Sequence, residues 1–86
     1  MLSKYKTQRA EAILCHLDSD ITCALRAEYN CSVNGATERD REAHFYRLMG
    51  EVNMLCTMKL ITFTQLMLLT DYYLDQHGKA MDEKSA

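Results

Sequence analysis

The absence of proline constrains the fold of this chain more than any other feature of its sequence. None of the 86 residues is proline, and only three are glycine. Sandwiches and barrels need many turns, for which these two residues are the usual choice, so their scarcity favours a few long helices. A chain of this length forms one domain at most and buries only about 60% of its unfolded surface. We therefore predict a single all-α domain.

The first helix is predicted over residues 3–29. Its apolar residues recur at every fourth position, at Ile13, Leu17, Ile21 and Leu25. This spacing places them on one face of a helix. The Asp-Ser-Asp triplet at residues 18–20 could instead begin a separate helix, because these residues cap helices well. We expect one continuous helix, since the apolar stripe passes through the triplet without a change of phase.

The segment 30–40 contains the one clear loop, and a second helix is predicted over residues 38–59. The Asn-Gly dipeptide at residues 34–35 is a strong turn signal within this segment. Thr37 can cap the helix that follows. Its side-chain oxygen can accept a hydrogen bond from the backbone N–H of Asp40, which lies three residues later.

A third helix is predicted over residues 63–77. Thr62 and Gln65 have the spacing of a capping box, in which each side chain bonds to the backbone of the other residue. Gly78 suits the left-handed residue that closes a helix. Residues 79–86 carry too little apolar surface to fold, so we expect a flexible tail there.

The predicted second helix carries more apolar surface than one neighbour can cover. Two stripes run side by side along it, formed by Phe45, Leu48, Val52 and Leu55 and by Tyr46, Met49, Cys56 and Leu60. Gly50 would also let another backbone approach the helix closely. Few helices remain in the chain to cover this surface, and a homodimer supplies the missing partner most simply. We therefore expect residues 1–78 to form a three-helix hairpin-type bundle that is completed by dimerisation.

Side chains from the second and third predicted helices are expected at the protein interface. Methionine is flexible and recurs on surfaces that bind other proteins, and tyrosine and arginine are frequent anchors of such interfaces. The residues assigned to this interface are Tyr46, Arg47, Met49, Gly50, Met54, Met58, Met67, Leu69 and Tyr73.

The reactive side chains form no recognised chemical site. His16, His44 and His77 fall one on each predicted helix, without the spacing of a metal-binding pair. Cys15 and His16 are adjacent, but neighbours on a helix project about 100° apart and do not form a catalytic dyad. The sequence also lacks a glycine-rich phosphate loop. We predict no catalytic residue, no metal, no cofactor and no enzyme activity.

The cysteines and the N-terminal segment both indicate a cytoplasmic protein. The four cysteines, at positions 15, 23, 31 and 56, have no close zinc-type pair and are expected to stay reduced. Residues 1–12 have no unbroken apolar core, so we expect no secretory signal. The longest nearly apolar stretch, residues 60–69, is about half the length that spans a bilayer, and we expect no membrane association.

The balance of charge gives no sign of a nucleic-acid partner. Ten basic and twelve acidic side chains leave a formal charge of −2. The second and third predicted helices have the outline of a helix-turn-helix, but no basic residue lies between Lys59 and Lys79 to contact phosphates. Direct binding to nucleic acid is therefore not expected. A small dimeric DNA-binding transcriptional regulator is the alternative, with Lys4, Lys6 and Arg9 as its phosphate contacts.

In its overall style the chain resembles the short helical accessory proteins of temperate bacteriophages, a class that includes antirepressors and other small protein inhibitors. The resemblance is carried by the proline-free chain, the unpaired cysteines and the capped helix start "LITFTQL" at residues 60–66. It implies a protein that acts by occupying a protein partner, such as a repressor or a host defence protein, without chemistry of its own. No residue receives a role through this resemblance.

Overall fold

A computed structural model describes residues 1–85 of the chain. In this range the protein contains four α-helices and no strand. The helices are α1 (Lys4–His16), α2 (Ser19–Asn34), α3 (Glu38–Thr57) and α4 (Phe63–Ser85). The prediction of an all-α fold is confirmed, whereas the predicted number of three helices is wrong.

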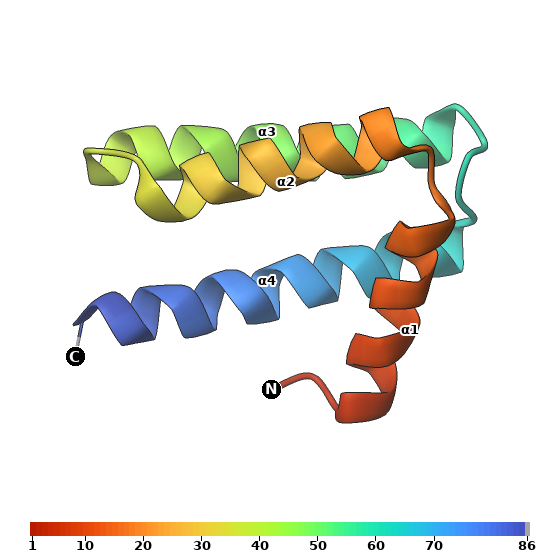
Figure 1. Cartoon of the computed structure of the whole chain (residues 1–86), viewed down its shortest axis with the longest axis horizontal. Coiled ribbons are helices and arrows are strands. Elements are labelled where there is room, and N and C mark those ends of the chain that lie inside the picture. The colour runs from red at the N-terminus through yellow and green to blue at the C-terminus, as the bar shows by residue number, and fades with distance from the viewer. Residues whose placement is uncertain (86) are drawn as a thin grey trace.

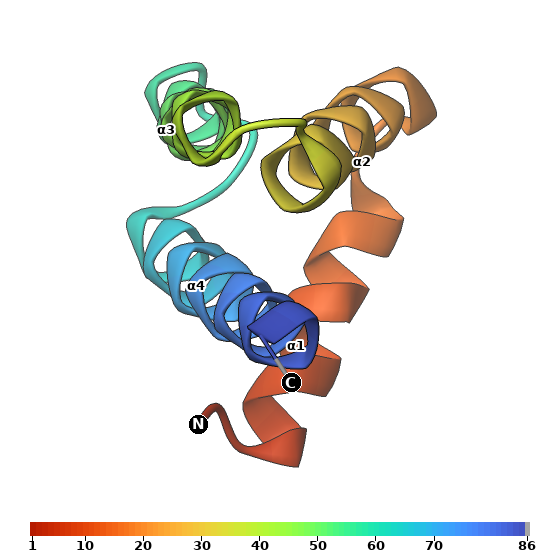
Figure 2. The same ribbon diagram turned by 90° about the vertical axis from the view of Figure 1, so that its left-hand side faces the viewer.

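The helices α2, α3 and α4 lie alongside one another, and α1 crosses α4 (Figure 1). α2 and α3 form an antiparallel hairpin, and α4 returns antiparallel to α3. Seen end on, α2, α3 and α4 occupy the corners of a triangle, while α1 runs steeply across α4 (Figure 2). The structure therefore has a fourth, crossing helix that the predicted three-helix bundle did not include.

The predicted helix over residues 3–29 is broken between α1 and α2, so the expectation of one continuous helix is wrong. Leu17 has extended backbone with ψ of 157°, and its N–H donates to the Leu14 carbonyl at 3.2 Å. The Asp18 side chain then caps α2 by accepting from the Asp20 N–H at 2.9 Å. The break lets α1 pack on α4 while α2 packs mainly on α3, which a straight helix could not do.

The turn signal at residues 34–35 marks a real but shorter loop. α2 continues through Asn34, so only residues 35–37 separate it from α3. Gly35 is required by close packing: a Cβ atom there would lie 2.9 Å from the Cys31 carbonyl oxygen and 3.1 Å from Arg41 Cγ. The Arg41 guanidinium donates to the Gly35 carbonyl at 2.8 Å and thereby holds the turn against α3.

The two helix caps predicted from the sequence are both confirmed. Thr37 caps α3 by accepting from the Asp40 N–H at 3.1 Å. At the start of α4 the Thr62 hydroxyl accepts from the Gln65 N–H at 3.1 Å, and the Gln65 side chain accepts from the Thr62 N–H at 2.9 Å. This reciprocal pair satisfies two of the amide donors that a helix start leaves free.

The corner between α3 and α4 contains the one non-glycine residue with positive φ in residues 1–85. Lys59 has φ of 62°, where glycine is the usual choice. Its N–H donates to the Cys56 carbonyl at 3.0 Å, and the Leu60 N–H donates to the Leu55 carbonyl at 2.9 Å. These two bonds form a Schellman motif, which satisfies the last carbonyls of α3 and turns the chain back toward α4.

Replacing Lys59 with glycine is expected to stabilise the fold by about 1 kcal/mol, because a side chain in the left-handed region costs energy that glycine avoids. Lys79→Gly is the matched control, since Lys79 lies within α4 and pairs with Asp75 at 3.1 Å. That variant should instead destabilise the helix by about 1 kcal/mol. Urea denaturation of both variants measures the difference, and a loss of stability for Lys59→Gly would contradict the strained corner.

The predicted end of the third helix is wrong, because α4 passes through Gly78 and continues to Ser85. The predicted flexible tail is therefore helical as far as Ser85, and Ala86 lies outside the described residues. Gly78 does not adopt positive φ. The extension is supported by the Lys79–Asp75 ion pair one helical turn apart and by the partly buried Met81.

The core lies where the four helices face one another. Its buried side chains are Ala10, Leu25, Leu48, Val52, Leu55, Ile61, Leu66, Leu69 and Tyr73. Every helix contributes at least one of them, so α1 belongs to the fold despite its crossing direction.

Candidate protein-binding surface

The outward face of α3 carries a row of exposed apolar side chains. Tyr46 is 75% exposed, Met54 is 54% exposed and Met58 at the end of the helix is 60% exposed. Together with the exposed Gly50 they recur at every fourth position, which places them in one row along the helix. We call Tyr46, Gly50, Met54 and Met58 the α3 stripe.

Gly50 in the middle of the α3 stripe is not explained by the packing of the chain. A Cβ atom at this position would meet no atom within 4 Å. Glycine within a helix costs roughly 1 kcal/mol relative to alanine. The fold would therefore gain from a larger residue here, and the gap makes sense where a second backbone approaches α3 closely.

Other residues predicted at the interface are accessible but lie outside the α3 stripe. Arg47 is exposed beside the stripe, and Met67 of α4 is 55% exposed. Met49 is partly buried and packs against the core. These three side chains are available to different degrees for contact with another protein.

Leu69 and Tyr73 are wrongly placed in the predicted interface. Leu69 is 0% exposed and Tyr73 is 6% exposed within a single chain. Both belong to the hydrophobic core, where α4 packs against α1, α2 and α3. They contribute to the core of the monomer and are not part of an exposed protein-binding face.

The apolar belt of α3 is also covered more fully than the sequence suggested. Leu48, Val52 and Leu55 are buried, and Met49 and Cys56 pack partly against the core. The neighbouring helices α2 and α4 supply this cover within one chain. The width of the belt therefore no longer argues for a dimer, and only the α3 stripe remains unpartnered on this helix.

Sequence reasoning missed exposed apolar residues at the start and along the side of α4. Phe63 is 67% exposed and Leu74 is 52% exposed. With Met67 they are spaced by four and then seven residues, which places them on one edge of α4 beside the buried Leu66 and Tyr73. The spacing of these residues is visible in the sequence. However, their row lies next to the buried apolar row of α4, and the sequence alone does not distinguish the exposed row from the buried one.

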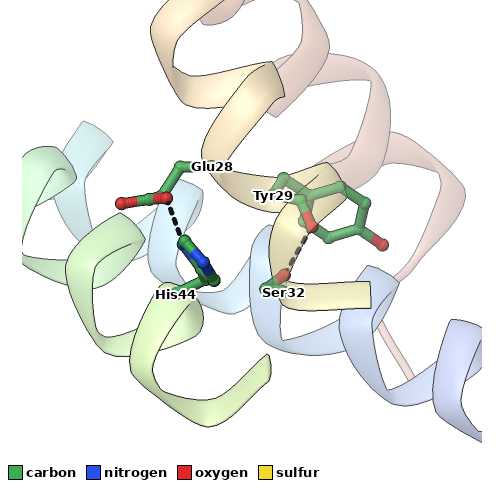
Figure 3. A network of polar contacts seen from close by, with 4 residues as sticks. All are labelled: Glu28, Tyr29, Ser32 and His44. Carbon is green, nitrogen blue, oxygen red and sulfur yellow. Dashed lines mark hydrogen bonds and ion pairs between the residues drawn. The ribbon is translucent and has the colours of Figure 1, made fainter. Parts of the chain in front are cut away.

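A polar contact joins α2 to α3, and a second one lies within α2 (Figure 3). His44 Nδ1 lies 2.7 Å from Glu28 Oε2, which links the two helices of the hairpin. The buried Ser32 hydroxyl donates to the Tyr29 carbonyl at 2.6 Å within α2. The contact with Glu28 gives His44 a structural role between α2 and α3.

Glu51 of α3 lies near this network without a partner of its own. Its Oε1 atom is buried and has no hydrogen-bond partner within residues 1–85. Burial, followed by the negative charge of Glu28, raises the pKa of the Glu51 carboxyl above its ordinary value of 4.5. The charged form of Glu51 therefore destabilises the folded chain.

Glu51→Gln is expected to raise the stability of the protein at neutral pH. Because the folded-state pKa of Glu51 lies above its unfolded-state value, the wild type loses stability as pH rises through that interval. The amide removes this loss, so the gain should be present at pH 7 and should fade below pH 4.5. Urea midpoints of wild type and variant across pH measure it, with the exposed Glu42→Gln as control. A gain that does not depend on pH would contradict this assignment.

The other two histidines also make hydrogen bonds within the fold. His16 Nδ1 lies 2.7 Å from the Ala12 carbonyl, and His77 Nε2 lies 3.2 Å from the Ser32 carbonyl. His77 also packs against the Phe45 ring, with ring centroids 4.4 Å apart. Within residues 1–85 no group of three or more His, Cys, Asp or Glu side chains could hold a metal ion. The structure thus brings together no metal-binding set from the reactive residues considered in the sequence.

The start of α4 lacks the features of a DNA-reading helix. Phe63, Thr64 and Met67 are its exposed side chains over the first turns, followed by the acidic Asp71. Phosphate and base contacts rely mainly on Arg, Lys, Asn and Gln.

Across the described part of the chain, no helix has the length and apolar content needed to cross a membrane.

The chain matches no known protein-family model, no curated protein and no solved structure. The candidate surface is therefore identified from the exposure and spacing of its side chains, without support from a related protein. Exposed apolar side chains and an unexplained glycine coincide at one place only along α3, the stripe around Gly50.

Proposed function

We propose that this protein is a non-enzymatic regulator that works by binding protein, and that two copies of the chain associate through the α3 stripe. The observation that carries the proposal is the position of Gly50 between the exposed Tyr46 and Met54. Large apolar side chains on either side of a gap suit the approach of another helix. Tyrosine and methionine are also enriched where proteins meet.

The occupant that we propose for the α3 stripe is a second copy of this chain. The arrangement around Gly50 is approximately symmetric along the helix, because a large side chain lies four residues before it, at Tyr46, and four residues after it, at Met54. An antiparallel α3 pair would therefore place the Tyr46 end of one stripe against the Met54 end of the other. Such self-complementarity is what a two-fold symmetric interface requires.

The target of the dimer is proposed from the resemblance to phage accessory proteins. In that class a small helical protein inhibits by occupying a partner. We propose a DNA-binding repressor or a host defence protein as the target, which the protein would block without chemical change.

Met54→Asp tests this proposal, because a charge on the α3 stripe would have to be desolvated in the dimer. Sedimentation equilibrium of the wild type at micromolar concentration should give the mass of two chains. Met54→Asp should give the mass of one chain with an unchanged helical circular-dichroism spectrum. Ala27→Asp places the same charge on the exposed face of α2 and should leave the dimer intact. A wild type with the mass of one chain, or equal masses for both variants, would overturn the proposal.

A further inference from the structure

A groove between α1, α2 and α4 lies apart from the α3 stripe. It opens at the bend of Leu17, where α1 and α2 diverge beside α4. Its volume is about 440 Å3. Small-molecule sites in proteins typically measure about 300–1,000 Å3, so the groove is large enough to hold a ligand.

Three tyrosines form an aromatic surface inside this groove. Tyr73 lies between the other two, with its ring centroid 5.8 Å from that of Tyr29 and 5.4 Å from that of Tyr72. None of the three hydroxyls makes a hydrogen bond within residues 1–85. Burial raises the pKa of all three, that of Tyr73 to about 12, so the hydroxyls remain protonated donors at neutral pH.

Opposite charges stand on the two walls of the groove. Glu11 lines it from α1 and Arg26 lines it from α2. In the part of the chain that the structure describes, neither forms an ion pair with any residue. Glu11 adds to the rise that burial causes in the pKa of Tyr72, whereas Arg26 opposes that rise at Tyr73. Glu11 and Arg26 thus line the same groove as the three tyrosines, from two different helices.

We propose that this groove binds a small zwitterion with an aromatic body, about the size of a dipeptide, with its carboxylate at Arg26 and its amine at Glu11. The guanidinium can bind a carboxylate through two parallel hydrogen bonds. An aromatic body would pack on the tyrosine rings, which prefer offset or edge contacts with another ring. A ligand with a single charge would leave the charge on the opposite wall unmatched. This inference does not depend on the proposed dimer.

Phenylalanyl-phenylalanine with free termini is the probe, and tyrosine fluorescence is the readout. The chain has five tyrosines and no tryptophan, so the groove contributes much of its fluorescence. The free dipeptide should bind saturably. Its N-acetylated form loses the amine and its C-terminal amide loses the carboxylate, and each should bind about tenfold more weakly, as expected for a lost charged hydrogen bond.

Variants of the two walls assign each end of the probe. Arg26→Gln should weaken the free dipeptide about tenfold but leave the affinity of the amide form unchanged. Glu11→Gln should also weaken the free dipeptide about tenfold, but it should leave the affinity of the N-acetylated form unchanged. Both residues are exposed, so the variants should unfold at the wild-type temperature. Arg39→Gln on α3 is the matched control and should bind all three probes like the wild type.

The cysteines provide an independent test of location. Cys15 lines the groove, while Cys23 and Cys31 are also exposed but lie outside it. Saturating dipeptide should slow the alkylation of Cys15 and leave the other two rates unchanged, as measured by peptide mass spectrometry. The proposal is overturned if the free dipeptide does not bind. It is equally overturned if blocked and free probes bind alike, or if Cys15 is not protected.

Discussion

Leu69→Asp is expected to unfold the protein. Leu69 is 0% exposed in the middle of α4 and belongs to the core shared by all four helices. An aspartate there would bury an unpaired charge and remove a large apolar side chain, at a cost of about 5 kcal/mol. A small domain has only about 5–15 kcal/mol of stability in total. The variant should therefore lose its cooperative thermal transition in circular dichroism.

Met67→Asp is the matched control for this loss. Met67 lies two residues before Leu69 on the same helix, but its side chain is 55% exposed. The same substitution there should change stability by less than about 1 kcal/mol, because the charge remains in water. A folded Leu69→Asp variant with the stability of Met67→Asp would show that this face of α4 is not the core.

Gly50→Gln is expected to act in opposite directions on stability and on assembly. Glutamine favours helix over glycine by roughly 0.5–1 kcal/mol, and the open space at Gly50 admits a side chain without a clash. The isolated chain should therefore become more stable. The dimer should be lost, because the glutamine would fill the gap in the α3 stripe and hold its amide against a partner helix.

Gly78→Gln separates these two effects. Gly78 is also exposed within a helix and would meet no atom within 4 Å if it carried a Cβ. This variant should gain stability in the same way, measured by urea denaturation of dilute protein, and should keep the wild-type mass in sedimentation. Equal masses for the two glycine variants would contradict a specific role for Gly50.

The helix starts could be predicted from the sequence because they depend on local chemistry. Thr37 and the pair Thr62 and Gln65 form their caps within a few residues of chain. The break at Leu17 was considered only as the alternative, since the caps at residues 18–20 allow a new helix but the same apolar spacing fits one helix or two helices packed on different neighbours. The extension of α4 past Gly78 was missed because glycine need not take positive φ in a helix that continues.

The candidate surface was predictable only in part, for a tertiary reason. Tyr46, Met54 and Met58 are exposed as an interface requires, whereas Leu69 and Tyr73 are buried. Both groups lie on apolar rows of a helix, and sequence periodicity does not say which row faces the rest of the chain. The packing of α4 against α1, α2 and α3 decides which row is buried.

Amide NMR spectra recorded over a dilution series test the central claim most directly, because they report both association and its location. If the α3 stripe joins two copies, dilution should shift the amide signals of residues 46–58 and leave those of α1 largely unchanged. The sedimentation mass should fall from two chains to one over the same range. Spectra that do not change while the mass stays at one chain, or changes confined to another helix, would contradict the account.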